Sequence, residues 1–325
     1  MTKVAQQIPS SAPSLTARAP SFFFNGHPPR RRALVVLLAV LAGFALTVVW
    51  SAKFVDRTIG GTVADSLLGH PADGAPIAGV TAGIAFALAT GVAGTFTACN
   101  VAVFSALAPL TGKAASRRGR VAAALRPLGW LAVGALTVSA AYGVVVALVG
   151  TSMPQFAQTQ GGQGFSPRLV QAMVVYGLIG LVMAYLGFAA LGVVRDPLAR
   201  VSARFPQAPM VAMGALIGAF LIGRPFSLFR QLFRDAAESH NVLYGAGAFA
   251  LQTLGNLVVM SVLLVAVSVV FGERLHRWMT ANPRRVSALT AAAFIAAGVF
   301  LVLYWDVRIL ARRDLIWYPM APWAG

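Results

Sequence analysis

Long uncharged apolar runs constrain this chain more than any other feature of its sequence. Several windows hold about 18 or more nearly uncharged residues, the length that a helix needs to cross a hydrocarbon core of roughly 30 Å. A segment inside lipid has to be helical, because lipid offers no hydrogen-bond partner to a bare N–H or C=O group. The sequence therefore predicts an all-α, polytopic transmembrane helix bundle and not a soluble enzyme.

The runs divide into one N-terminal anchor and a transmembrane core. The anchor covers residues 33–50, and because no small-x-small cleavage site follows it, we expect it to be retained and not removed as a signal peptide. The core extends over residues 77–305 and contains six apolar segments. They lie at 77–110, 128–150, 169–192, 209–223, 242–271 and 286–305. With the anchor, the sequence predicts about seven transmembrane helices.

Two tails flank these helices. Residues 1–32, which are rich in Ser and Pro and end in three arginines, are predicted to be a disordered basic cytoplasmic tail. Residues 306–325 are predicted to be an extracytoplasmic tail at the membrane interface. Trp317, Tyr318 and Trp323 suit such a place, because amphipathic aromatic rings anchor at the level of the lipid headgroups.

The distribution of basic residues predicts the orientation. A net charge of +17 would suggest nucleic acid, but the 26 Lys and Arg residues cluster in the short loops between apolar runs. With the N-terminus in the cytoplasm, 17 of them lie inside and nine outside, as the positive-inside rule requires. We therefore expect a multi-pass protein of the inner (cytoplasmic) membrane with its C-terminus outside. Its partner is the lipid bilayer, and no nucleic acid is expected.

Composition excludes several kinds of site. All nine Asp and Glu residues lie outside the apolar runs, so we expect no proton or sodium relay on intramembrane acids. A single cysteine excludes a disulfide framework and a multi-thiolate metal site. The four histidines show no ligand spacing, so neither a metal nor a cofactor is expected.

The six core helices predict an inverted repeat. They divide into two sets of three, and because three is odd, the second set would cross the membrane upside down relative to the first. In such 3+3 proteins the working site lies where the leading helix of each half is interrupted near mid-membrane. The leading helices here carry Gly-rich stretches followed by polar residues. The candidates are Thr97, Cys99 and Asn100 in the first half and Arg224 and Pro225 in the second.

Asn100 and Arg224 are the candidates for a common cavity. A charge at the bilayer centre costs at least ~2.5–3.5 kcal/mol on insertion scales and is normally turned inward or onto water. The alternative for Asn100 is an interhelical hydrogen bond that only holds the bundle together. The alternative for Arg224 is an interfacial side chain that reaches outward, since Pro225 ends the helix at that point.

Cys99 is a candidate thiol. Its alternative is a small apolar core residue. The functional reading needs a partner sulfur, because disulfide exchange passes through a mixed disulfide and the chain has no second cysteine.

Residues 224–240 form an amphipathic pattern. Phe226, Phe229 and Phe233 share one side of a helix, and Arg230 and Arg234 lie on another. We expect either a segment at the outer interface or a re-entrant piece packed against the bundle.

Two stretches resemble the DsbD/CcdA group of membrane thiol-reductant carriers, the cytochrome c biogenesis protein transmembrane region. In the second half, residues 218–260, and especially 237–247, are similar to the segment that follows the family's second cysteine. In the first half, residues 94–99 are similar to the family's Gly-x-x-Thr-Pro-Cys turn. The resemblance covers the core from about 77 to 305.

The resemblance implies a six- to eight-helix inverted repeat that moves reducing equivalents to the outer face through one cysteine in each half. Cys99 falls on the first of these cysteines, and Arg224 stands at the second. Ala98 and Ala102 stand where the family has prolines beside its first cysteine. The resemblance therefore implies the fold and a central cavity. The dithiol reaction would also need the second cysteine, which this chain lacks.

Three functions follow as hypotheses. The first is a divergent or accessory member of this group in redox maturation of extracytoplasmic proteins, with a thioredoxin-like protein or another membrane subunit as partner. If it is an enzyme, its reaction is thiol-disulfide electron transfer. The second is a permease for a small anion or zwitterion on the same scaffold, drawn by Arg224 and helix ends near Asn100. The third is a non-catalytic assembly subunit of a membrane complex.

Overall fold

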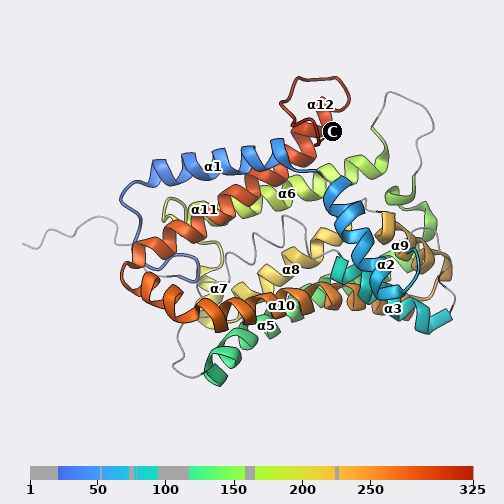
Figure 1. Cartoon of the computed structure of the whole chain (residues 1–325), viewed down its shortest axis with the longest axis horizontal. Coiled ribbons are helices and arrows are strands. Elements are labelled where there is room, and N and C mark those ends of the chain that lie inside the picture. The colour runs from blue at the N-terminus through green and yellow to red at the C-terminus, as the bar shows by residue number, and fades with distance from the viewer. Residues whose placement is uncertain are drawn as a thin grey trace, which may run out of the picture.

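The structure is a computed structural model that describes residues 21–51, 53–72, 77, 79–93, 117–157, 165–223 and 227–324. Within these ranges every regular element is a helix and none is a β-strand. Figure 1 shows the long helices lying side by side in one bundle. The prediction of an all-α bundle is therefore confirmed for the part of the chain that the structure describes.

Among the described residues, five helical stretches are long and apolar enough to cross a membrane, so the chain is a multi-pass membrane protein. They are Arg32–Val49, which is α1; Leu125–Ser152, from α5 (Arg117–Val149) into η4 (Gly150–Ser152); Pro167–Ala190, which is α6; Val242–Phe271, within α10 (Val242–Thr280); and Pro283–Ala311, which joins α11 (Pro283–Val302), η6 (Leu303–Val307) and α12 (Arg308–Ala311). Two shorter apolar helices are α3 (Gly79–Ala93) and α8 (Ala208–Gly223).

Short helices connect these elements. They are η1 (Lys53–Gly61) and α2 (Thr62–Leu68) before α3, η5 (Pro154–Phe156) before α6, α7 (Ala199–Arg204) before α8, and α9 (Ser227–Ser239) between α8 and α10.

Local sequence explains where two of the long helices begin. Before α6, the Ser166 side chain accepts a hydrogen bond from the Leu169 N–H, and Pro167 takes the first helical position. Before α11, the Asn282 side chain accepts from the Arg284 N–H. Serine and asparagine are preferred caps, because their side chains satisfy N–H groups that have no partner inside the helix.

Close contacts fix the relative directions of the helices. Gly143 of α5 lies against Gly245 of α10, and further back along α5 the Ser139 hydroxyl lies 2.6 Å from that of Thr253. Residue numbers therefore rise on one helix as they fall on the other, so α5 and α10 are antiparallel. The pair α6 and α11 is antiparallel for the same reason, because Gly180 packs on Gly298 while Gly187 packs on Ile295.

The α5/α8 crossing brings two backbones into direct contact. A Cβ on Gly214 would overlap the carbonyl oxygen of Leu131, and a Cβ on Gly134 would overlap that of Val211. Each helix therefore supplies one glycine and one carbonyl oxygen three residues before it. Small residues permit this approach, which gains van der Waals contact where lipid supplies no hydrophobic driving force.

The α3/α10 crossing repeats this arrangement. A Cβ on Gly91 would overlap the carbonyl oxygen of Gln252, and a Cβ on Gly255 would lie 2.5 Å from that of Leu88. The glycine again follows the contacted carbonyl by three residues on both helices. Two helix pairs far apart in the sequence are thus joined by the same backbone contact.

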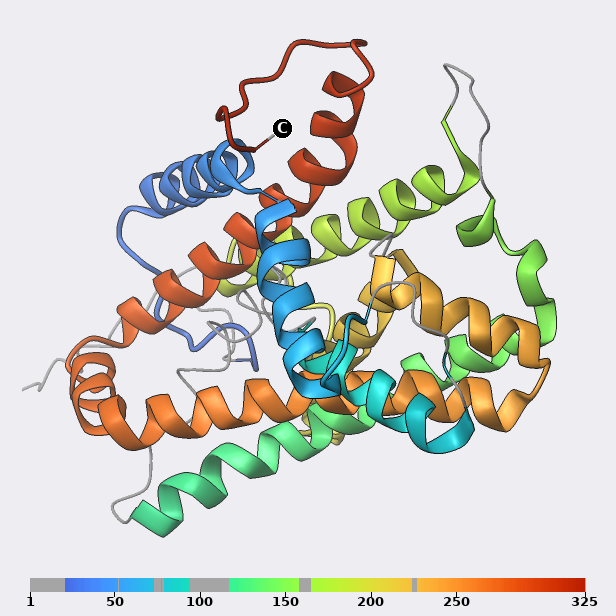
Figure 2. The same cartoon turned by 45° about the vertical axis from the view of Figure 1, so that its right-hand side comes forward.

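Helix directions give the bundle two distinct ends. The basic face is the end at which α1 and α11 begin and α10 ends, at the left of Figure 1. The tail face is the opposite end, at which α11 ends and where α9 and residues 312–324 lie. Figure 2 shows the C-terminal residues looping back beyond α12. The basic face carries Arg30, Arg31, Arg32, Arg126, Arg195, Arg200, Arg204, Arg274, Arg277, Arg284 and Arg285.

Residues 21–29 pack on the basic face. Phe23 and Phe24 are buried, and the Phe23 ring lies 5.8 Å from that of Phe294 in α11. The Asn25 side-chain amide donates to the carbonyl of Pro283 at 2.8 Å. The tail predicted for residues 1–32 therefore ends in a packed segment, held by aromatic contacts that the Ser/Pro-rich composition did not indicate.

Arg308 joins α12 to the end of α1. Its side chain is 1% exposed and donates to the carbonyls of Thr47 at 2.8 Å and Trp50 at 2.9 Å, and also to that of Ala324. The last carbonyls of a helix have no partner inside it and attract a cation. Its guanidinium also lies 4.9 Å from the Tyr304 ring centroid. Arg308 therefore has a structural role within residues 306–325.

The three aromatic residues predicted as interfacial anchors differ in exposure. Trp317 and Trp323 are 86% and 66% exposed, but Tyr318 is buried, with its hydroxyl against that of Thr47. The tail is thus attached to α1 by Tyr318 and presents its two tryptophans outward.

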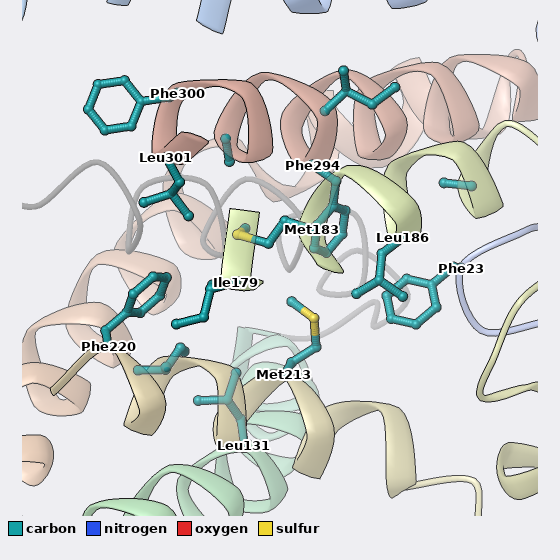
Figure 3. Close-up of a cluster of buried hydrophobic side chains, with 14 of the residues drawn as sticks. Phe23, Leu131, Ile179, Met183, Leu186, Met213, Phe220, Phe294, Phe300 and Leu301 are labelled. Carbon is teal, nitrogen blue, oxygen red and sulfur yellow. The ribbon is translucent and has the colours of Figure 1, made fainter. Parts of the chain in front are cut away.

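An apolar core lies between α5, α6, α8 and α11. Figure 3 shows Leu131, Ile179, Met183, Met213 and Phe294 meeting in it, and all five are at most 5% exposed. Aliphatic, aromatic and thioether groups of the described residues meet at this point.

Candidate functional site

The five residues predicted for the site lie outside the described residues. Thr97, Cys99 and Asn100 follow α3, which is described as far as Ala93. Arg224 and Pro225 fall between α8, which ends at Gly223, and α9, which begins at Ser227. The described residues nearest to them in the sequence are the ends of α3 and α8 and the start of α9.

The C-terminal end of α8 is capped by two side chains of α6. The Gln171 amide donates to the carbonyl of Ile222 at 2.7 Å, and the Tyr176 hydroxyl donates to that of Phe220 at 3.1 Å. These carbonyls belong to the last described turn of α8. In lipid such groups have to find partners inside the protein. The two side chains therefore stabilise this turn, which precedes Arg224 in the sequence.

Gln171 also belongs to a wider polar network. Its amide nitrogen donates to the Tyr142 hydroxyl at 3.1 Å, and Tyr142 donates to the Gln155 side-chain oxygen at 2.7 Å. We call Tyr142, Gln155, Gln171 and Tyr176 the α8-end network. It joins α5, η5, α6 and α8 through neutral groups alone.

Two atoms of the α8-end network have no hydrogen-bond partner among the described residues. They are the Gln155 amide nitrogen and the Gln171 amide oxygen, and both are buried. One is a donor and the other an acceptor, and an unmade bond of this kind costs about 1–3 kcal/mol. The network therefore holds one donor and one acceptor that no described group uses.

Helix α9 packs against this network with its apolar side. The Tyr142 ring lies 6.1 Å from that of Phe233 in α9 and 5.6 Å from that of Phe249 in α10, and these two phenylalanines stack at 4.3 Å. Phe229, Leu232, Phe233, Ala236 and Ala237 are all buried. Of the two expectations for residues 224–240, the described part therefore fits a piece packed against the bundle.

Gln252 of α10 is a second polar residue inside the bundle. Its side chain is 1% exposed, and within the part of the chain that the structure describes neither its amide oxygen nor its amide nitrogen has a hydrogen-bond partner. The next residue, Thr253, donates to Ser139 of α5 at 2.6 Å. Gln252 lies about one helical turn beyond Phe249, which contacts Tyr142.

Asp306 lies in a helix just beyond an apolar run. The apolar run ends at residue 305, but the helix continues as η6 and α12, so Asp306 lies inside the stretch Pro283–Ala311. Its carboxylate is half-buried and rests on α6, where a Cβ on Gly177 would come within 2.9 Å of it. The hydropathy pattern missed it because Arg308 and Asp306 end the run while the backbone remains helical.

Sequence reasoning also missed Tyr142, Gln155, Gln171 and Gln252. Attention to charge and to helix breaks selected Arg224 and its neighbours, whereas these four are neutral. Three of them, Tyr142, Gln171 and Gln252, lie inside apolar runs, where a polar side chain needs an internal partner. That signal was present, but which of them would meet depends on how the helices pack.

The described residues offer no cluster of three or more His, Cys, Asp or Glu side chains that could hold a metal ion. A comparison with protein-family models finds no match for the sequence, and neither do comparisons with curated proteins and with solved structures.

Proposed function

We propose that this protein is a membrane carrier of the DsbD/CcdA type, built from an N-terminal anchor and two inverted sets of three helices. The first half would comprise α3, α5 and α6, and the second α8, α10 and α11. The supporting observation is that the α3/α10 and α5/α8 crossings share one arrangement of glycines and carbonyl oxygens. If α3 is exchanged with α8 and α5 with α10, one crossing becomes the other.

The directions of the helices agree with this proposal. An in-plane twofold axis relates helices that run in opposite senses, and α5 and α10 are antiparallel, as are α6 and α11. The proposal makes these pairs equivalent. With α1 it gives seven spans that alternate in direction.

The residues that follow the leading helix of each proposed half in the sequence favour a working site there. Discontinuous helices at a repeat interface form the binding sites of many carriers. In sequence, α3 is followed by Cys99 and Asn100, and α8 by Arg224.

Charge favours one orientation. The basic face holds most of the arginines of the described loops, and basic loops remain in the cytoplasm. We therefore assign the basic face to the cytoplasm and the tail face to the outside, with the N-terminus inside.

The redox chemistry of this proposal needs sulfur from a partner. The Cys99 thiolate would attack a disulfide of an outer partner, forming a mixed disulfide and releasing the partner's other sulfur as a thiolate. A dithiol protein of the thioredoxin kind would then attack the Cys99 sulfur and release the outer partner fully reduced. Its second thiolate would displace Cys99 and close its own disulfide. Two electrons pass from one partner to the other, and Cys99 is regenerated.

A permease for a small anion or zwitterion is the second candidate. The free amide atoms of Gln155 and Gln171 favour it, because they lie beside the end of α8, one residue before Arg224. A site with a donor, an acceptor and a nearby cation suits a small polar solute.

Trapping of mixed disulfides tests the redox proposal. Cells that express the full chain are quenched with acid, their free thiols are alkylated, and adducts are separated without reductant. We expect an adduct with the wild type and none with Cys99→Ser, while Arg224→Ala retains it. If no adduct forms with the wild type and Arg224→Ala abolishes solute uptake, the carrier is a permease and the redox proposal is wrong.

A further inference from the structure

The Gln252 side chain is buried and forms no hydrogen bond with the described residues. Its amide could form hydrogen bonds through both its oxygen and its nitrogen, yet neither has a partner among the described residues, and the side chain is 1% exposed. Leaving buried polar groups unpaired opposes folding by about 1–3 kcal/mol. The amide therefore adds no hydrogen bond to the packing of the described residues, and a bound polar group would satisfy it.

The position of Gln252 on α10 places it toward the interior. Thr253 faces α5, since it donates to Ser139, and Gly255 faces α3, since it packs on Leu88. With 100° between successive residues, Gln252 lies on the arc between these two directions. Its side chain therefore leaves α10 between α3 and α5 and not toward lipid.

The equivalent position in the other crossing is occupied by Leu131. Its carbonyl oxygen contacts Gly214, just as that of Gln252 contacts Gly91. Leu131 is 0% exposed and lies in the apolar core drawn in Figure 3. The same backbone contact is thus built with an aliphatic side chain, so packing of the crossing does not require an amide.

We propose that Gln252 is the hydrogen-bonding residue of a binding site for the amide group of a small substrate. A carboxylate would offer acceptors only, and an ammonium would offer donors only, so each would leave one side of Gln252 unpaired. An amide offers a donor and an acceptor side by side and satisfies both. That the same substrate also carries a thiol or disulfide rests on the function proposed above. The substrate class is therefore an amide-bearing low-mass thiol.

Thermal unfolding with a thiol-free analogue tests the site itself. The purified full chain in detergent is mixed with N-acetyl-S-methylcysteine amide, which keeps two amide groups and lacks a reactive sulfur. A ligand that binds only the folded state raises the Tm, and we expect a rise of about 2 °C or more for the wild type and none for Gln252→Leu. An equal rise for both, or no rise for the wild type, would overturn the proposal.

The stability of the ligand-free variants separates a binding role from a structural one. Gln252→Leu introduces the residue found in the equivalent crossing, so its Tm should be about 2 °C above that of the wild type. Leu131→Gln is the matched control: it should lower the Tm and still respond to the analogue. If Gln252→Leu lowers the Tm by several degrees, the amide supports the fold and the binding proposal is wrong.

A second reagent distinguishes this proposal from the proposed redox function. The disulfide dimer of N-acetylcysteine amide would transfer one half to Cys99, releasing the other half as a thiolate, and intact-mass measurement detects the adduct. A thermal shift without an adduct retains the Gln252 site and rejects the thiol role of Cys99. An adduct without a thermal shift rejects the Gln252 site and retains the thiol role.

Discussion

The α5/α8 and α3/α10 crossings have the same backbone contact and opposite chemistry. Both place a glycine on a carbonyl oxygen of the facing helix, reciprocally and with the same spacing. At the contacted residue one has Leu131 in an apolar core, and the other has Gln252, whose amide has no partner among the described residues. The repeated feature explains the fold, because close backbone approach holds helices together in lipid. The side chain that differs between the crossings, Gln252, is therefore the candidate for a function beyond folding.

The largest effects are expected from filling the crossings. Gly214→Ala and Gly91→Ala place a Cβ on a backbone oxygen that cannot move aside without separating two helices. Overpacking of this kind lowers the free energy of unfolding by typically 1–3 kcal/mol, and we expect about 3 kcal/mol for each. Unfolding in detergent, followed by circular dichroism, measures the loss.

Gly247→Ala is the control for these variants, because a Cβ there meets nothing within 4 Å. It should leave stability unchanged or raise it slightly, since alanine favours the helix by about 1 kcal/mol over glycine. If Gly91→Ala behaved like Gly247→Ala while Gly214→Ala unfolded the chain, the two crossings would not be equivalent.

A smaller effect is expected where α8 ends. Tyr142→Phe removes the hydroxyl that joins Gln155 to Gln171, which leaves a buried amide oxygen unpaired. The loss should be about 1–2 kcal/mol in the free energy of unfolding. Tyr185→Phe is the matched control, because its hydroxyl also donates to a carbonyl, that of Arg195, but is exposed. Equal losses in the free energy of unfolding for the two variants would mean that the buried Tyr142 hydroxyl stabilises the fold no more than an exposed hydroxyl does.

The smallest effect on the free energy of unfolding is expected from a double variant that exchanges the two side chains. The double variant with Leu131→Gln and Gln252→Leu moves the amide from one crossing to the other. Each change should alter the free energy of unfolding by about 1 kcal/mol in opposite directions, so the sum should be near zero if the sites are independent. Chemical denaturation of the two single variants and the double variant measures this. A double variant several kcal/mol below the wild type would mean that the two positions have different packing.

Hydropathy predicted most of the helices because lipid leaves the backbone no alternative. The runs at 128–150, 169–192 and 242–271 correspond to α5, α6 and α10. Helix ends were less well predicted, since a helix can continue past the apolar run when its polar residues find partners. Arg308 shows this: three carbonyls hold its guanidinium, and the helix extends six residues beyond the predicted end at 305.

The candidate site was less predictable than the fold. Charge and helix-breaking residues are visible in a sequence, and they led to Arg224 and Pro225. The amides of Gln171 and Gln252 become informative only once their neighbours are known. The Gln171 amide donates to the last described turn of α8, whereas the Gln252 amide donates to no described group. The hydrogen-bond partners of a buried amide depend on tertiary packing, so the spacing of residues in the sequence does not predict them.

Opposite insertion of the two halves is the central claim, and labelling of two introduced cysteines tests it most directly. Ser152 follows α5 and Ala281 follows α10, the second helix of each proposed half, and both residues are exposed. In a Cys99→Ser background, a membrane-impermeant maleimide should label Ser152→Cys in intact cells and Ala281→Cys only after the membrane is opened. Labelling of both from the same side would contradict the inverted repeat.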